Sequence, residues 1–243
     1  MLIPAPRDGR VFERPMRPGL ADCAPSGRMR LDAVARWLQD IAYQDVEDAG
    51  LAEAAVWVLR RTRIRVERFP RFAERLSVVT FCSGIGRMWA ERRTSIARPG
   101  EPVADVEAVA LWVHLDPVER VPTQLTDAEL QAYGPTGADR RVSARLRHPG
   151  PEEPESEHGW SFRATDCDLA DHVNNAAYWQ PLEDELLAGA EPQAIDVEIE
   201  FRTPSQPGSK RILASGDRRW ITDGAGDVHA SLALNELRLG FGD

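Results

Sequence analysis

The chain has 243 residues, of which 42% are hydrophobic, so it can bury one large core or two smaller ones. Its formal net charge of −9 disfavours general nucleic-acid binding, because a duplex binder needs an excess of basic residues. The sequence contains no apolar run of about 18 residues, the length that a membrane helix needs, and no apolar stretch of signal-peptide length near its start. We therefore expect a soluble cytoplasmic protein without a membrane span.

Residues that commonly hold metals or cofactors are scattered along the sequence. Cys23, Cys82 and Cys167 lie far apart, which disfavours both a disulfide framework and a structural zinc site. The histidines show no ligand spacing. Gly84 and Gly86 join two strand-like runs, a context typical of a hairpin turn rather than a phosphate-binding loop. We expect neither a metal nor an organic cofactor.

The first half of the chain begins with a strand-like run at 11–16. A helix is predicted over 31–46, because apolar residues recur there at helical spacing, and Gly50 supplies a stop. Alternation of apolar and polar residues then predicts four antiparallel strands, at 56–69, 76–82, 88–97 and 103–115.

The second half repeats this order of elements. A strand is predicted at 159–164 and a helix at 173–188. Four further strands follow, at 195–202, 211–215, 218–221 and 228–239. The stretch 131–158 between the halves is rich in proline, glycine and charged residues, as linkers are. The predicted organisation is a first repeat at 1–130, a linker at 131–158 and a second repeat at 159–243.

One helix followed by antiparallel strands, found twice, predicts an α+β fold. A parallel sheet would need helices between its strands, and the pattern shows none there. The economical architecture is a tandem (double) hotdog, in which each antiparallel sheet wraps around its own central helix. The two sheets would pair edge to edge, as a pseudo-dimer within one chain.

The segment at 168–178 reads Asp-Leu-Ala-Asp-His-Val-Asn-Asn-Ala-Ala-Tyr. It resembles the D-x-x-x-H-V-N-N-x-x-Y motif of plant-type acyl-acyl carrier protein thioesterases. The resemblance extends from about Val11 to about Leu239. In the first half it rests on runs similar in type and order to that family, at 57–61, 64–66, 68–70 and 109–113.

The resemblance implies a double hotdog enzyme that hydrolyses fatty acyl thioesters, without a metal. The substrate carrier would be acyl carrier protein or, in acyl-CoA, coenzyme A. The second repeat would hold the active site and the first repeat the substrate channel. At the matching place in the first repeat stand Ser26, Gly27 and Arg28, with no Asp-His pair. Two departures concern the site: Ala170 replaces an asparagine of the family, and Pro204 and Ser205 stand where the family has a Glu-Cys pair.

Thioester hydrolysis needs an activated water and hydrogen-bond donors for the developing oxyanion. Asp168 is the candidate general base, and His172 would relay a proton or orient the carboxylate. The N–H groups of Val173 and Asn174 would lie in the first turn of the predicted helix, where free donors and the helix dipole favour an oxyanion. The side chains of Asn174 or Asn175 would add a donor.

The same residues have structural interpretations. An aspartate before a helix is commonly a cap, and a lone His172 more often stabilises the fold than catalyses a reaction. Trp57 and the other tryptophans of the first repeat are core residues by default, and Trp57 is our candidate to line the acyl channel. Cys167 is expected to be a buried apolar residue facing away from Asp168, and Ser205 to lie in a plain loop.

Three arginines, Arg61, Arg63 and Arg65, alternate along one predicted strand and so share one face. The simplest interpretation is a solvated face. The alternative is a docking patch for an acidic carrier protein or for a phosphate of phosphopantetheine or coenzyme A.

Two other functions remain open at this stage. In a hotdog hydratase or dehydratase, Asp168 and His172 would move protons at the β-carbon of the acyl group. In a non-catalytic acyl-thioester-binding module, the catalytic set would have decayed, as Ala170 and Pro204 allow. The expected oligomeric state is a monomer with its internal pseudo-dimer, or a homodimer.

Overall fold

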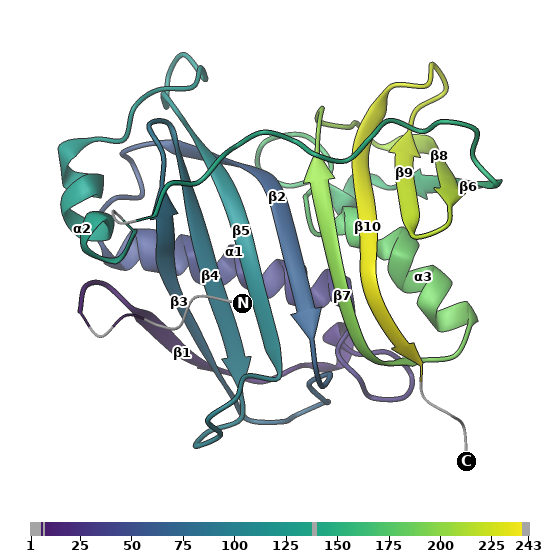
Figure 1. The fold of residues 1–243 in the computed structure, drawn as a ribbon, viewed down its shortest axis with the longest axis horizontal. Helices are drawn as coiled ribbons and strands as arrows, with labels where there is room; N and C mark the ends of the chain where they lie inside the picture. Colours follow the sequence, from purple (N-terminus) through teal and green to yellow (C-terminus); the bar gives the residue numbers. More distant parts are fainter. Residues whose placement is uncertain (1–5, 7, 138–139, 240–243) are drawn as a thin grey trace.

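The computed structural model describes residues 6, 8–137 and 140–239, so the outermost ends of both predicted repeats and linker residues 138–139 lie outside it. Its strands pair into a single antiparallel sheet in the order β1-β3-β4-β5-β2-β7-β10-β9-β8-β6 (Figure 1). The strands are β1 Phe12–Met16, β2 Val56–Val66, β3 Leu76–Ile85, β4 Trp89–Ala97, β5 Val106–Leu115, β6 Ser156–Phe162, β7 Pro192–Phe201, β8 Gly208–Ser215, β9 Arg218–Thr222 and β10 Val228–Leu239. The helices are α1 Leu31–Asp48, α2 Asp127–Gly137 and α3 Gln180–Ala188, and three 3₁₀ turns are η1 Leu20–Asp22, η2 Ala164–Asp166 and η3 Ala177–Trp179.

The two halves of the sheet mirror each other. Outward from the centre, the first half runs β2-β5-β4-β3-β1 and the second runs β7-β10-β9-β8-β6. Corresponding strands therefore occupy corresponding places. At the centre, β2 pairs with β7, in a register that sets Arg61 opposite Glu200 and Val66 opposite Ile195. The predicted edge-to-edge pairing of two sheets within one chain is confirmed.

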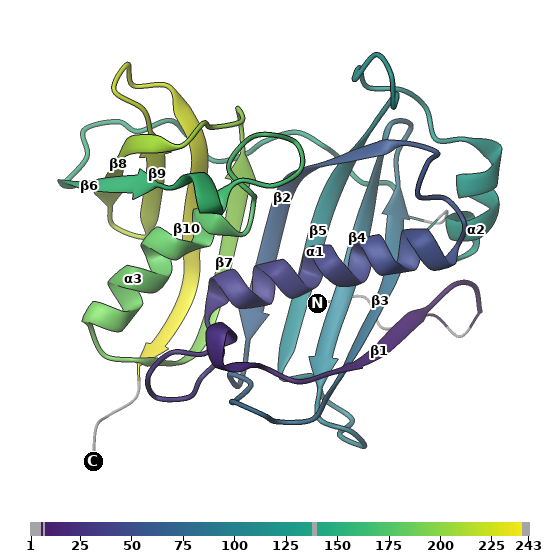
Figure 2. The same cartoon turned by 180° about the vertical axis from the view of Figure 1, so that it is seen from behind.

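One helix of each repeat covers the same face of the sheet, α1 on the first half and α3 on the second (Figure 2). The predicted periodicity of α1 is confirmed, because Leu31, Val34, Leu38 and Ile41 all lie in the core and are at most 5% exposed. Burying each such side chain contributes roughly 1.5–3 kcal/mol. Just beyond the helix, Gly50 adopts a positive φ of 70°, the conformation of a helix stop.

Two sequence predictions of secondary structure are wrong at their boundaries. The predicted helix over 173–188 begins only with the turn η3, and α3 itself starts at Gln180. The predicted linker over 131–158 contains the second half of α2 and the start of β6. Pro135 inside α2 hides the helical pattern, since proline usually ends a helix. The helix has a sequence signal nonetheless: Thr126 and Glu129 form a capping box, with the N–H of Thr126 donating to Glu129 Oε2 (2.8 Å) and that of Glu129 to Thr126 Oγ1 (3.3 Å).

Two of the three alternating arginines of β2 face acidic residues across the central seam, where β2 pairs with β7. Arg63 binds Asp196 through two hydrogen bonds of 2.7 and 2.6 Å, and Arg61 Nε lies 3.7 Å from Glu198. Arg65 pairs with Glu67. The shared face predicted from the alternation is therefore largely neutralised, which disfavours its use as a docking patch for an acidic carrier.

Residues 140–155 cross the outer face of the sheet as a strap between the repeats (Figure 1). Indole N–H groups hold the strap on both sides of the seam: Trp89 donates to the carbonyl of Val142 and Trp220 to that of Pro149, each at 2.9 Å. At the seam, Arg202 donates to the carbonyl of His148 (2.6 Å). The strap therefore adds a second connection between the repeats beside the β2–β7 ladder.

A buried ion pair joins the repeats on the helical face. Arg28, in the loop before α1, lies 2.7 Å from Glu183 of α3, and the two side chains are 2% and 3% exposed. Glu183 also accepts the N–H of Leu31 (2.9 Å), one of the free donors at the start of α1. Burial raises the pKa of Glu183, although Arg28 and this N–H both favour the carboxylate.

We expect Glu183→Ala to lower the free energy of unfolding by about 3–5 kcal/mol, because it leaves the buried Arg28 guanidinium with only the more distant and partly exposed Glu191, at 3.7 Å, as a counter-charge. Chemical denaturation followed by tryptophan fluorescence measures this. The control is Arg238→Ala, which removes a pair with Glu67 whose side chains are 54% and 39% exposed, and which should change stability by at most about 1 kcal/mol. Equal effects of the two variants would contradict a structural role for the buried pair.

Candidate active site

The motif loop at 163–175 has a counterpart in the first repeat. In both, a 3₁₀ turn ends in an Asp-Cys pair, and that cysteine bridges the residue six positions later: Cys23 with Met29, and Cys167 with Val173. Gly27 and Asp171 occupy equivalent places and both have positive φ, 86° and 59°. The loop that carries the motif is therefore a structural repeat of the loop before α1.

Asp168 is held by its own loop at the surface of the protein. Its Oδ1 accepts the N–H of Ala170 and its Oδ2 accepts the side-chain Nδ2 of Asn174, both at 2.9 Å. The carboxylate remains 29% exposed. These two bonds fix its direction and leave lone pairs on both oxygens for a water.

His172 lies beside Asp168 without touching it. The distance from its Nδ1 to Asp168 Oδ1 is 3.9 Å, within ion-pair range but too long for a hydrogen bond. Nδ1 is buried and has no hydrogen-bond partner among the residues that the structure describes. The predicted pair is thus brought together, in a geometry that a small rotation of the imidazole would close.

Gln39, in the middle of α1, joins this group from the other repeat. Its Nε2 donates to Asn174 Oδ1 (3.1 Å), and its Oε1 accepts Nδ2 of Asn174 (3.2 Å). Because Nδ2 of Asn174 must face the Asp168 carboxylate, the orientation of both amides is fixed. Both hydrogens of Asn174 Nδ2 are then used, whereas Nε2 of Gln39 keeps a second hydrogen without an acceptor among the described residues.

The predicted oxyanion donors are wrong in position. Val173 and Asn174 precede the helix, and their N–H groups donate to the carbonyls of Ser205 (2.9 Å) and Asp166 (2.8 Å), so neither is free. Val173 is 1% exposed and belongs to the core. Asn175 lies against α1, beside a small void that Leu38 and Trp179 also line.

A cavity of about 460 Å³ opens next to this group, between α1 and the sheet of the first repeat. Gln39 lines it, and Leu169 and Ala170 of the motif loop lie at its rim; Asp168 and His172 are not among the lining residues. Trp57, the sequence candidate for the acyl channel, lines the wall of this cavity. Asp168 and His172 therefore stand beside the mouth of the cavity and not inside it.

The wall of the cavity is held from behind by α2. The Trp57 ring packs edge-on against His114, with 4.9 Å between ring centroids, and His114 Nε2 lies 3.0 Å from Glu129 of α2. His114 Nδ1 faces the carbonyl of Thr123 at 3.0 Å. The helix α2, which the sequence analysis did not predict, thus helps to position Trp57 through His114.

Ser205 and Cys167, two side chains near the motif whose chemistry would allow a nucleophilic role, have structural environments. Ser205 is 1% exposed and its hydroxyl donates to the carbonyl of Gln206 (3.1 Å). Cys167 is half-buried rather than buried, at the end of a 3₁₀ turn and not in a strand. Desolvation and the carboxylates of Asp171, Asp168 and Asp166 raise the pKa of its thiol, which disfavours the nucleophilic thiolate.

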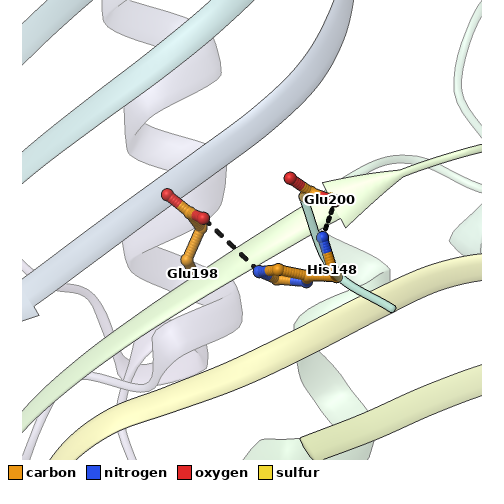
Figure 3. A group of neighbouring side chains, drawn as sticks. All are labelled: His148, Glu198 and Glu200. Atoms are coloured by element: carbon orange, nitrogen blue, oxygen red, sulfur yellow. Dashed lines mark hydrogen bonds and ion pairs between the residues drawn. The ribbon is translucent and has the colours of Figure 1, made fainter. Parts of the chain in front are cut away.

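Beneath the strap, His148, Glu198 and Glu200 place possible metal-ligand atoms within 4.8 Å of one another (Figure 3). Their donors and acceptors are already engaged. Glu200 accepts the N–H groups of Arg147 (2.7 Å) and His148 (2.9 Å), and His148 Nδ1 faces Ser231 Oγ at 3.0 Å. His148 Nε2 lies 3.4 Å from Glu198. These contacts support a structural role, fastening the strap to β7 and β10.

The fold and this site together define a double hotdog protein whose carboxylate, imidazole and amide groups stand at the mouth of a largely apolar cavity. Solved structures confirm the fold. A Lactobacillus plantarum protein described as an oleoyl thioesterase superposes with a TM-score of 0.79 at 17% identity, covering 97% of this chain and 99% of that one. The 12:0-ACP thioesterase of Umbellularia californica superposes with a TM-score of 0.75 at 19% identity, covering 95% and 98%.

Sequence comparison assigns the family. The model of the acyl-ACP thioesterase N-terminal domain matches residues 9–133, and that of the C-terminal domain matches residues 150–228. An uncharacterised protein of Mycobacterium tuberculosis is 27% identical over 212 residues, covering 85% of this chain and 83% of its own. The chain belongs to the acyl-ACP thioesterase family and is therefore a thioester hydrolase acting on fatty acyl thioesters. No helix among the described residues is long and apolar enough to cross a membrane.

We expect Gln39→Met to lower kcat/KM for thioester hydrolysis at least about five- to thirtyfold, because a loss of hydrogen bonds worth about 1–2 kcal/mol frees the Asn174 amide that orients Asp168. Steady-state kinetics measure the change. The matched control is Gln44→Met, at a position of the same helix that does not line the cavity, with the unfolding midpoint measured for both variants. Wild-type kinetics for Gln39→Met would exclude Gln39 from the site.

Proposed function

We propose that this protein hydrolyses fatty acyl groups from acyl carrier protein at one site, where the motif loop of the second repeat meets α1 of the first. The observation that carries the proposal is the hydrogen-bonded row Asp168–Asn174–Gln39 at the mouth of the acyl-sized cavity. It joins a base, an orienting amide and a free donor beside a space that excludes water from an acyl chain.

Asp168 activates the attacking water. Its two hydrogen bonds aim the carboxylate, while its partial exposure lets a water reach it. The carboxylate accepts a proton as the water oxygen bonds to the thioester carbonyl carbon. His172, next to it, is placed to exchange that proton.

Gln39 stabilises the oxyanion. Its Nε2 donates one hydrogen to Asn174 and keeps a second one, Gln39 lines the cavity, and a side-chain amide is a suitable donor to a tetrahedral intermediate. This assignment replaces the backbone donors expected at Val173 and Asn174. When the intermediate collapses, the carbon–sulfur bond breaks, and His172 returns the proton to the departing thiolate. One water is consumed, and one free acid and one thiol are released.

The acyl chain occupies the cavity against Trp57, with its thioester at the rim beside Ala170. The pantetheine arm then leaves the protein past Leu169, which is fully exposed at the mouth. On this arrangement the first repeat, 1–130, binds the chain, and the second, 159–243, supplies the base.

We expect Asp168→Asn and His172→Ala each to lower kcat by about a hundredfold or more, the usual contribution of general acid–base catalysis. Thiol release is measured with acyl carrier protein and with coenzyme A as carriers of the same acyl groups. The control is Asp171→Asn, an exposed residue of the same loop at a positive φ that asparagine tolerates.

Three results would contradict the proposal. Undiminished turnover by well-folded Asp168→Asn and His172→Ala proteins would remove the assigned residues. Interconversion of enoyl and hydroxyacyl groups without thiol release would indicate a hydratase. Tight binding of acyl thioesters that stay intact would indicate a binding module.

The chain is further proposed to act as a monomer, because the β2–β7 ladder already pairs the edges that separate hotdog chains would use to associate. Sedimentation equilibrium tests this, and a stable homodimer would contradict it.

A further inference from the structure

The deep end of the cavity is polar, unlike its walls. The lining residues at the mouth, Tyr43 and Leu169, are 60% and 107% exposed, whereas Arg92 and Tyr133 are 8% and 5% exposed. Arg92 and Glu91 come from β4 and Tyr133 from α2. An acyl chain that fills the cavity from the thioester inward would end against these groups.

Arg92 presents unused donors there. Its Nη1 lies 2.6 Å from Asp45 Oδ2 and donates to Thr80 Oγ1 (3.4 Å). No hydrogen bond joins its Nε or Nη2 to another residue in the described part of the chain, and its guanidinium lies 5.5 Å from the centroid of the Tyr133 ring. Arginine carries five N–H donors, so several remain for a ligand.

Tyr133 adds a donor that is equally unused. Its hydroxyl is buried, and the hydroxyl proton has no acceptor among residues 6, 8–137 and 140–239. Burial raises the pKa of Tyr133 to about 12, so the group stays a neutral O–H donor. A buried hydroxyl without a partner costs free energy, which a ligand oxygen would recover.

The charges around this end balance, which decides the kind of ligand group. Asp45 pairs with both Arg92 and Arg10, Arg10 also pairs with Asp48 (2.7 Å), and Glu91 pairs with Arg140. Three cations thus face three anions. An added carboxylate would remain uncompensated in a buried place, whereas a neutral oxygen would accept from Tyr133 and Arg92 and, as a hydroxyl, donate to Glu91.

We infer that the preferred acyl group carries a hydroxyl at its distal end, which hydrogen-bonds to Tyr133 and Arg92 at the base of the cavity. This inference rests on the proposed function, because it places the thioester at Gln39. Asp45, whose carboxylate holds Arg92, follows Gln39 by six residues on α1, a distance of about 9 Å at the helical rise of about 1.5 Å per residue. The distance selects chains of medium length.

The test compares acyl thioesters of graded length, each as the unsubstituted, the ω-hydroxy and the ω-carboxy form. For the length that fits best, we expect kcat/KM for the ω-hydroxy form to exceed that for the unsubstituted form at least about tenfold, because a site built around unpaired donors discriminates against a chain that leaves them unpaired. The ω-carboxy form is expected to be the poorest of the three substrates.

Tyr133→Phe should reduce the preference for the ω-hydroxy form about fivefold or more, through loss of one hydrogen bond to the substrate. Tyr43→Phe makes the same chemical change at the mouth and should leave the preference within about twofold. Equal or better hydrolysis of unsubstituted chains by the wild-type protein, or an unchanged preference in Tyr133→Phe, would overturn the inference. The wild-type comparison decides it even if the variant does not fold.

Calorimetric binding of the free ω-hydroxy and unsubstituted fatty acids separates this inference from the proposed function. If no thioester is cleaved, the proposed function fails, while a preference for the hydroxy acid that Tyr133→Phe abolishes still supports the polar cavity base. If thioesters are cleaved and the two acids bind equally, only the inference about the chain end fails.

Discussion

The candidate site depends on the pairing of β2 with β7. Through that ladder the two half-sheets become one, and only then does the motif loop of the second repeat lie against α1 of the first. Asp168 and Gln39 are far apart in sequence, and Asn174 connects them across the junction between the repeats. The seam also uses the strand edges that each half would otherwise expose. Anything that loosened it would separate Asp168, the proposed base, from Gln39, the proposed oxyanion donor.

The repeated order of elements, the helix α1 and the approximate bounds of the strands could be predicted from the sequence. Period-2 alternation and helical spacing are local signals, so they can be read without knowing the fold. The sequence did not predict α2, where Gly134 and Pro135 break the helical pattern and only the capping box at Thr126 marks the start. The helix expected from Val173 begins later, because the N–H groups of Val173 and Asn174 find carbonyl partners outside any helix. Periodicity cannot reveal such partners.

The Asp-His pair was predictable as a motif, whereas the donor beside it was not. A glutamine within an amphipathic helix is read as part of the solvated face, and nothing in the sequence around Gln39 connects it with Asn174. The contact also clarifies the departure at position 170. Ala170 contributes its backbone N–H to Asp168 and leaves the rim of the cavity open, while Gln39 supplies an amide from the opposite side. A missing asparagine therefore does not leave the site without a side-chain donor.

The internal repeat gives a physical reason for the single candidate site that we propose among the described residues. Counted from Cys23 and Cys167, Arg28 and His172 stand at equivalent positions, and so do Gln39 and Glu183. At one junction between the repeats, His172 of the second and Gln39 of the first stand with Asp168 and Asn174 beside the cavity. At the other junction, Arg28 and Glu183 form a buried ion pair that also binds the start of α1. Separating a buried charge pair is costly, so the Arg28–Glu183 pair holds the two repeats together at this second junction. The same geometry thus gives the chain a candidate chemical site at one junction and a structural ion pair at the other.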